Sequence, residues 1–123
     1  KLNLLLVGLG GSLGAVSRFW VGKIMSQKFG ADFPWGTFCV NILGALLLGI
    51  LSAFGADKNI YLLFGDGFLG AFTTFSSFMY EGFNLFKGSE KLNAFAYVSG
   101  TLILGIIGYF AGFGITGMLL NLA

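Results

Sequence analysis

Four long apolar stretches constrain the fold of this chain more than any other feature of its sequence. They cover approximately residues 2–24, 37–55, 60–86 and 95–122. Each reaches or exceeds the ~20 residues that an α-helix needs to cross the hydrocarbon core of a lipid bilayer. We therefore predict an all-α membrane protein, with four transmembrane helices in a single transmembrane domain over residues 1–123.

The composition supports a lipid environment and excludes several classes of function. Only 10% of the residues are charged, whereas a soluble domain carries about 25%. The net charge of +2 without a basic tract gives no basis for a nucleic-acid partner. With no His and one Cys, the chain has neither a Cys/His metal site nor a nucleophile–base pair, so we expect no enzyme activity.

The charges outside the spans give a weak signal for orientation. The lysines expected on one side are Lys23, Lys28, Lys87 and Lys91, and those on the other side are Lys1 and Lys58. Because this bias is small under the positive-inside rule, the chain is expected either to insert with a weak preference or to insert both ways round. We interpret the first apolar stretch as a span and not as a signal peptide, since no small-residue cleavage site follows it.

Pairs of glycines occur at small-xxx-small spacing in two of the spans. Gly10 and Gly14 form one pair, and Gly108 and Gly112 form the other. Four-residue spacing places both members on one helix face, where another backbone can approach closely. We predict helix contacts at both pairs, although a glycine-rich sequence also produces this spacing by chance.

Strongly polar side chains within spans are expensive to bury in lipid, and Arg18 and Asn41 are of this kind. Arg18, in the first span, either extends to the interface or provides a fixed positive charge at the mouth of a pore. Asn41, in the second span, either hydrogen-bonds to another helix or points a donor into a conduction path.

The third span contains a cluster of hydroxyls that predicts an interruption of the helix. Thr73, Thr74, Ser76 and Ser77 follow Gly70 closely. One such residue usually bonds back to its own helix, but four together favour a local break near the membrane midplane. A break is tolerated there only where the freed backbone groups are buried or coordinate an ion.

Further along the same span, Phe75 and Phe78 share a helix face that Glu81 continues. Taken alone, the two rings are most simply lipid-facing or core aromatics. Their electropositive edges could also meet an anion. A carboxylate within a span is by default a functional candidate. Thr101 and Tyr109 in the fourth span could add hydroxyls to a polar path.

Together these residues resemble the motifs of the CrcB (Fluc) fluoride channel family. The resemblance is carried by Gly36-Thr37 with Asn41, by residues 67–78 (GFLGAFTTFSSF) with Glu81, and by residues 10–18 (GGSLGAVSR). It implies passive export of cytoplasmic fluoride across the plasma membrane by an antiparallel homodimer of dual topology, with two pores.

The resemblance also implies roles for particular residues. The fluoride pore would comprise Phe75, Phe78, Asn41, Arg18, Thr37, Ser77, Glu81, Thr101 and Tyr109. The backbone carbonyls of Gly70 and Thr73 would hold a structural sodium ion at the dimer interface. The partners would be fluoride, a second copy of the chain and the lipid bilayer.

Two other functions are consistent with four spans. A small multidrug or guanidinium-type exporter exchanges protons for cations through a carboxylate in its first span, whereas the first span here has Arg18 and no acidic residue. A purely structural or assembly subunit is the second alternative. The clustered hydroxyls argue against it, because such a bundle has little reason to break a helix there.

Overall fold

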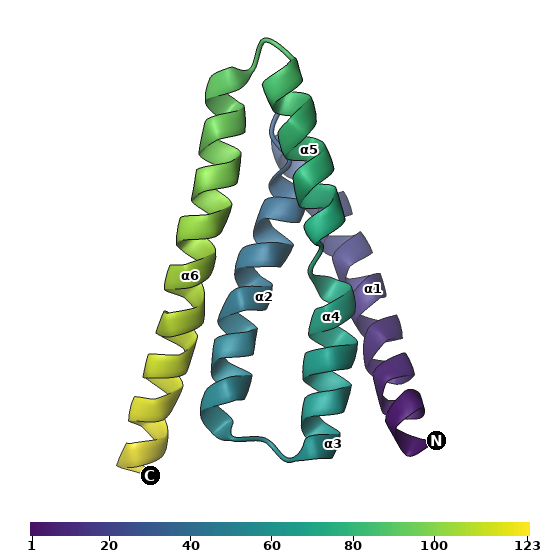
Figure 1. Ribbon diagram of the computed structural model, residues 1–123, viewed down its shortest axis with the longest axis vertical. Coiled ribbons are helices and arrows are strands. Elements are labelled where there is room, and N and C mark those ends of the chain that lie inside the picture. Colours follow the sequence, from purple (N-terminus) through teal and green to yellow (C-terminus); the bar gives the residue numbers. More distant parts are fainter.

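The computed structural model describes all residues, 1–123, and contains helices but no strands. The elements in chain order are α1 (Leu2–Phe29), α2 (Trp35–Phe54), α3 (Lys58–Ile60), the π-helix η1 (Tyr61–Leu69), α4 (Gly70–Phe72), α5 (Phe75–Lys87) and α6 (Lys91–Leu122). Figure 1 shows four helical columns that alternate in direction, with the third built from α3, η1, α4 and α5. Both chain ends lie at the same end of the bundle.

Three of these helices, α1, α2 and α6, are long and apolar enough to cross a membrane. The remaining predicted span, the third, is helical over residues 58–72 and again over Phe75–Lys87. Between these parts, Thr73 and Thr74 adopt extended backbone conformations. The interruption predicted from the hydroxyl cluster is therefore present, close to the middle of this column.

The long helices extend beyond the apolar stretches that predicted them. Helix α1 continues to Phe29, five residues past the expected span end, and α6 begins at Lys91. The added turns contain Lys, Ser and Gln, which are adequate helix formers outside the bilayer core. The π-helix η1 is a further difference, because the sequence predicted an ordinary α-helix over Tyr61–Leu69.

Both glycine pairs lie at helix contacts, as predicted. Gly10 and Gly14 bring α1 against the backbone of η1 at Leu63 and Phe68. Gly112 brings α6 against the Leu46 carbonyl of α2, and Gly108 lies beside the same helix. A Cβ at Gly10, Gly14 or Gly112 would overlap backbone atoms of the neighbouring helix. The pairs α1–η1 and α2–α6 are thus the two principal helix contacts of the protomer.

The protomer buries little of its own apolar surface. Only 17 of 123 residues are buried, while large apolar side chains along α1 and α6 remain exposed. An outward apolar surface of this extent fits a chain whose solvent is lipid. The polar connections lie at the two ends of the bundle: residues 30–34 and 88–90 at one end, and residues 55–57 at the other, beside the termini.

Candidate functional site

The side chain of Asn41 on α2 binds the backbone at the helix break. Its Nδ2 donates to the Thr74 carbonyl at 2.9 Å, and its Oδ1 accepts from the Thr74 N–H at 2.8 Å. In an unbroken helix the Thr74 N–H would bond the Gly70 carbonyl. Asn41 therefore replaces a helical partner and fixes the break against α2. One Nδ2 proton remains for another acceptor.

Thr74 also starts the second half of the broken helix. Its Oγ1 accepts from the Ser77 N–H at 3.2 Å, which is a standard N-cap of α5. The hydroxyls of Thr74 and Ser76 lie 3.4 Å apart. The Thr73 hydroxyl turns back to the Leu69 carbonyl at 2.9 Å. Only some hydroxyls of the cluster therefore bond to nearby backbone groups. The Ser77 hydroxyl makes no hydrogen bond within the chain.

Arg18 points inward and not toward the interface. Its guanidinium donates from Nη1 to the Thr73 carbonyl at 3.2 Å. This contact joins α1 to the same break that Asn41 holds from α2. Arg18 therefore does not extend to the membrane surface, which was one of the two alternatives for this residue. The positive charge of the Arg18 guanidinium is the feature of this region that attracts anions.

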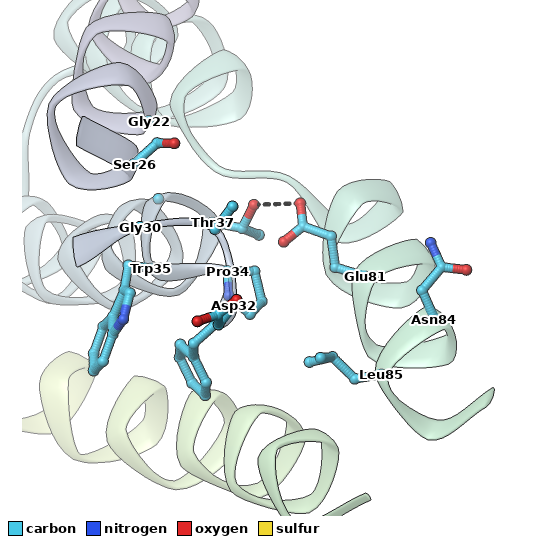
Figure 2. Close-up of a pocket in the computed structure, with 13 residues that line it drawn as sticks. Gly22, Ser26, Gly30, Asp32, Pro34, Trp35, Thr37, Glu81, Asn84 and Leu85 are labelled. Carbon is cyan, nitrogen blue, oxygen red and sulfur yellow. Dashed lines mark hydrogen bonds between the residues drawn. The ribbon is translucent and has the colours of Figure 1, made fainter. Parts of the chain in front are cut away.

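Glu81 forms a second polar cluster, toward the far end of α5. Its Oε1 accepts from the Thr37 hydroxyl at 2.8 Å, as drawn in Figure 2, and its Oε2 lies 3.5 Å from the Tyr97 hydroxyl. A cavity of about 470 Å³ reaches this pair from the end of the bundle. Its lining comes from α1, the 30–34 connection, α2 and α5. Glu81 thus faces a polar recess and is held by two other helices.

The two phenylalanines after the break differ sharply in exposure. Phe75 is 74% exposed, whereas Phe78 is 6% exposed. Their ring centroids are 6.0 Å apart, and Phe78 also lies 5.5 Å from the ring of Tyr97. Phe78 is therefore packed within the protomer, while Phe75 faces outward from it.

The fourth-span candidates separate into two places. Thr101 is buried, and its hydroxyl donates to the Tyr97 carbonyl at 2.6 Å, which is the back-bonding typical of a lone Thr in a helix. Tyr109 lies about 12 Å further along the axis of α6. There its ring stacks on Phe113 and its carbonyl lies against Gly49. Within one protomer, Tyr109 is not brought together with Glu81.

Sequence reasoning did not identify two residues that the structure makes prominent. Tyr97, near the start of the fourth predicted span, is completely buried between Phe78 and Phe38 and reaches Glu81. The signal was its spacing of four residues from Thr101, which places both on one face. The second residue is Asp66 in η1, a carboxylate within an apolar span.

A second cavity, of about 490 Å³, connects Asp66 to the helix break. Its lining includes Asn41 and Gly44 from α2, and Asp66, Gly70 and Thr73 from the broken column. The two positions predicted to offer carbonyls to a cation therefore face one recess. Oxygen ligands such as these carbonyls suit alkali and alkaline-earth cations. The structure contains no group of three or more His, Cys, Asp or Glu side chains that could hold a metal ion.

Comparison with known proteins gives a consistent result over nearly the whole chain. Residues 5–113 match the family described as CrcB-like protein, Camphor Resistance (CrcB). A protein of Clostridium acetobutylicum named fluoride-specific ion channel FluC 2 is 50% identical over 90% of this chain and 95% of its own length. The fluoride-specific ion channel FluC of Hahella chejuensis is 40% identical over 96% of this chain and 97% of its own. FluC 1 of Carboxydothermus hydrogenoformans is 38% identical over 90% of each.

Proposed function

The chain belongs to the CrcB-like family, and on that premise we propose that it is a fluoride-selective channel through which cytoplasmic fluoride leaves the cell passively. Curated relatives are named as fluoride-specific ion channels and not as enzymes. This agrees with the prediction that the chain has no catalytic activity.

The observation that carries the proposal is the break held by Asn41. It gathers a side-chain amide, the Ser76 and Ser77 hydroxyls and the Phe75 ring at one place in an otherwise apolar column. Fluoride is small and strongly hydrated, so a pore has to replace its water with closely placed donors. The free Nδ2 proton of Asn41 and the unbonded Ser77 hydroxyl are donors of this kind. Arg18 adds a positive charge that favours an anion over a cation.

We further propose that two copies assemble as an antiparallel homodimer with two pores. Phe75 is exposed although it adjoins the buried Phe78, which supports a path completed by a second copy. Tyr109 lies far from Glu81 in one protomer, and an inverted partner would bring it toward the opposite protomer's break. The weak charge bias between the two ends of the bundle is compatible with insertion in both orientations in the plasma membrane.

A structural sodium ion between the two breaks is part of this proposal. The Gly70 carbonyl has lost its helical donor to Asn41, and the Thr73 carbonyl accepts only one bond, from Arg18. Both oxygens therefore have capacity for a cation, so the residues fit the ion. Two carbonyls are few for an alkali ion, and a second copy would double them. Such an ion would tie the two broken helices together without being transported.

Anion efflux from liposomes that contain the purified protein tests the proposed function. Vesicles are loaded with fluoride or with chloride, and an ion-selective electrode follows release after addition of an ionophore for the counter-cation. We expect rapid fluoride release with negligible chloride release. Folded, dimeric protein that releases no fluoride would overturn the proposal. The family gives no support to the alternative of a cation exporter. Cation uptake driven by a proton gradient would be evidence for that alternative.

A further inference from the structure

Asp66 is the only acidic or basic side chain between Lys58 and Glu81. It lies eight residues after Lys58, at the centre of η1. Eight residues of helix place it about 12 Å from the loop at that end of the bundle. A charge at such a depth is costly to hold in a membrane, at about 2.5–3.5 kcal/mol on insertion scales, unless a partner or water accompanies it.

No partner for Asp66 exists within the protomer. Its carboxylate takes part in no side-chain hydrogen bond and in no ion pair. By contrast, Asp57 accepts from the Ile60 N–H, and Glu81 accepts from Thr37. Asp66 is thus the one carboxylate that lies within a span and lacks a compensating group.

The cavity beside Asp66 leads to the break. Asp66, Gly70 and Thr73 all line this recess of about 490 Å³. Asp66 and Gly70 are four residues apart and share a helix face. Since helical side chains lean toward the N-terminus, the carboxylate lies on the loop side of Gly70. Within the recess, Asp66 therefore lies nearer to that end of the bundle than the Gly70 and Thr73 carbonyls do.

The negative charge of Asp66 would balance the positive charges of Arg18 and of a bound cation. The Thr73 carbonyl already accepts from the Arg18 guanidinium, so a sodium ion nearby adds a second positive charge to the same region. Two cations near one oxygen repel each other unless an anion compensates them. Asp66 is the only charged residue among those that line the recess, and its sign is the one required.

We infer that Asp66 is a cation-binding group of this recess, which draws sodium in from the loop end and strengthens its binding at the break. The inference rests on the proposed sodium site and adds a side-chain ligand to it. The carboxylate would supply a negatively charged oxygen to the cation that the Gly70 and Thr73 carbonyls would hold. A chain with a neutral residue at this position retains the carbonyls but binds the cation more weakly.

Sodium-dependent stability of the purified dimer tests this inference. The melting temperature in detergent is measured as sodium chloride replaces N-methyl-D-glucamine chloride at constant ionic strength. For Asp66→Asn we expect the sodium concentration of half-maximal stabilisation to rise at least tenfold relative to the unmodified chain. Asp32→Asn, which removes the same charge from the 30–34 connection at the other end of the bundle, is expected to leave that concentration unchanged.

Asp66→Ser repeats the test with a smaller neutral side chain, in case Asp66→Asn does not give a folded dimer. An unchanged sodium midpoint in either variant would overturn the role of Asp66. A melting temperature of the unmodified chain that ignores sodium would overturn the inference together with the sodium site. Fluoride efflux from the same preparation is scored separately, so failure of the channel proposal is distinguishable from both outcomes.

Discussion

Asn41 has a structural role in the fold and, in the proposed channel, a donor to offer to the pore. Its amide forms two hydrogen bonds with the backbone of Thr74 and keeps one proton free. The sequence left open an interhelical bond and a donor in a conduction path. The geometry contains the first and has capacity for the second, because an amide carries two donors and one acceptor.

Asn41→Asp is the sharpest test of this residue. The substitution keeps an acceptor for the Thr74 N–H but sets a carboxylate oxygen against the Thr74 carbonyl. We expect fluoride efflux to fall at least tenfold and the free energy of unfolding to fall by about 1–3 kcal/mol. Asn59→Asp, on an exposed residue of α3, is the matched control and should behave as the unmodified chain. Unchanged efflux in Asn41→Asp would remove Asn41 from the path.

Phe75 and Phe78 should respond differently to truncation, because only Phe78 is packed within the protomer. Phe78→Ala should lower the free energy of unfolding by about 3–5 kcal/mol, through loss of its buried contacts with Tyr97. Phe75→Ala should change protomer stability by less than about 0.5 kcal/mol. Both should impair fluoride efflux. Denaturant titration beside the efflux assay separates the two effects, and full efflux in Phe75→Ala would exclude that ring from the pore.

Single residues also mark the limits of what the sequence predicted. Arg18, Asn41 and Glu81 stood out because polar groups in lipid need partners. The partners of Arg18 and Asn41 did not stand out, because Thr73 and Thr74 bind them through backbone atoms, which no sequence pattern identifies. Tyr97 was missed because an aromatic near a span end has an adequate explanation at the interface.

At the level of elements, apolar length predicted the helices well and predicted their ends less well. Lipid sets the length of an apolar stretch, but helical hydrogen bonding continues wherever residues such as Lys28 and Lys91 allow it. The break after Gly70 was predictable because four hydroxyls gathered there. The π-helix η1 was not, since wider turns of this kind come from how a helix packs and have no motif of their own in this sequence.

The contact between α2 and α6 offers a matched pair of glycines for a test. Gly112 lies against the Leu46 carbonyl, whereas Gly114 has no neighbouring atom within 4 Å of an added Cβ. Gly112→Ala should force the helices apart and lower the free energy of unfolding by about 1–3 kcal/mol. Gly114→Ala should not destabilise the chain. Thermal melts in detergent compare the two, and equal melting temperatures would show that this contact contributes little.

At the scale of the whole molecule, the exposed apolar surface agrees with the proposal that two copies assemble. One protomer leaves most large apolar side chains exposed and keeps the Phe75 ring uncovered. The number of lysines at the two ends of the bundle differs too little to determine the orientation of the chain in the membrane. The orientation therefore has to be measured.

Labelling of residue 123 measures the orientation directly. In a Cys39→Ala background, Ala123→Cys provides one thiol at the end of the bundle where both termini lie. We expect a membrane-impermeant maleimide to label about half of the protein in intact cells, and the remainder only after permeabilisation. Complete labelling, or none, before permeabilisation would contradict insertion in both orientations.

The shared location of the two termini also restricts how this fold could become a single polypeptide. If two gene copies were fused through a short linker, the second copy would begin on the side of the membrane where the first ended. Both halves would then point the same way. A fused pair of opposite orientation requires an additional membrane-crossing segment between the copies. Fusion of two copies in the opposite orientations proposed above would therefore need a crossing segment in addition to the helices of the two copies.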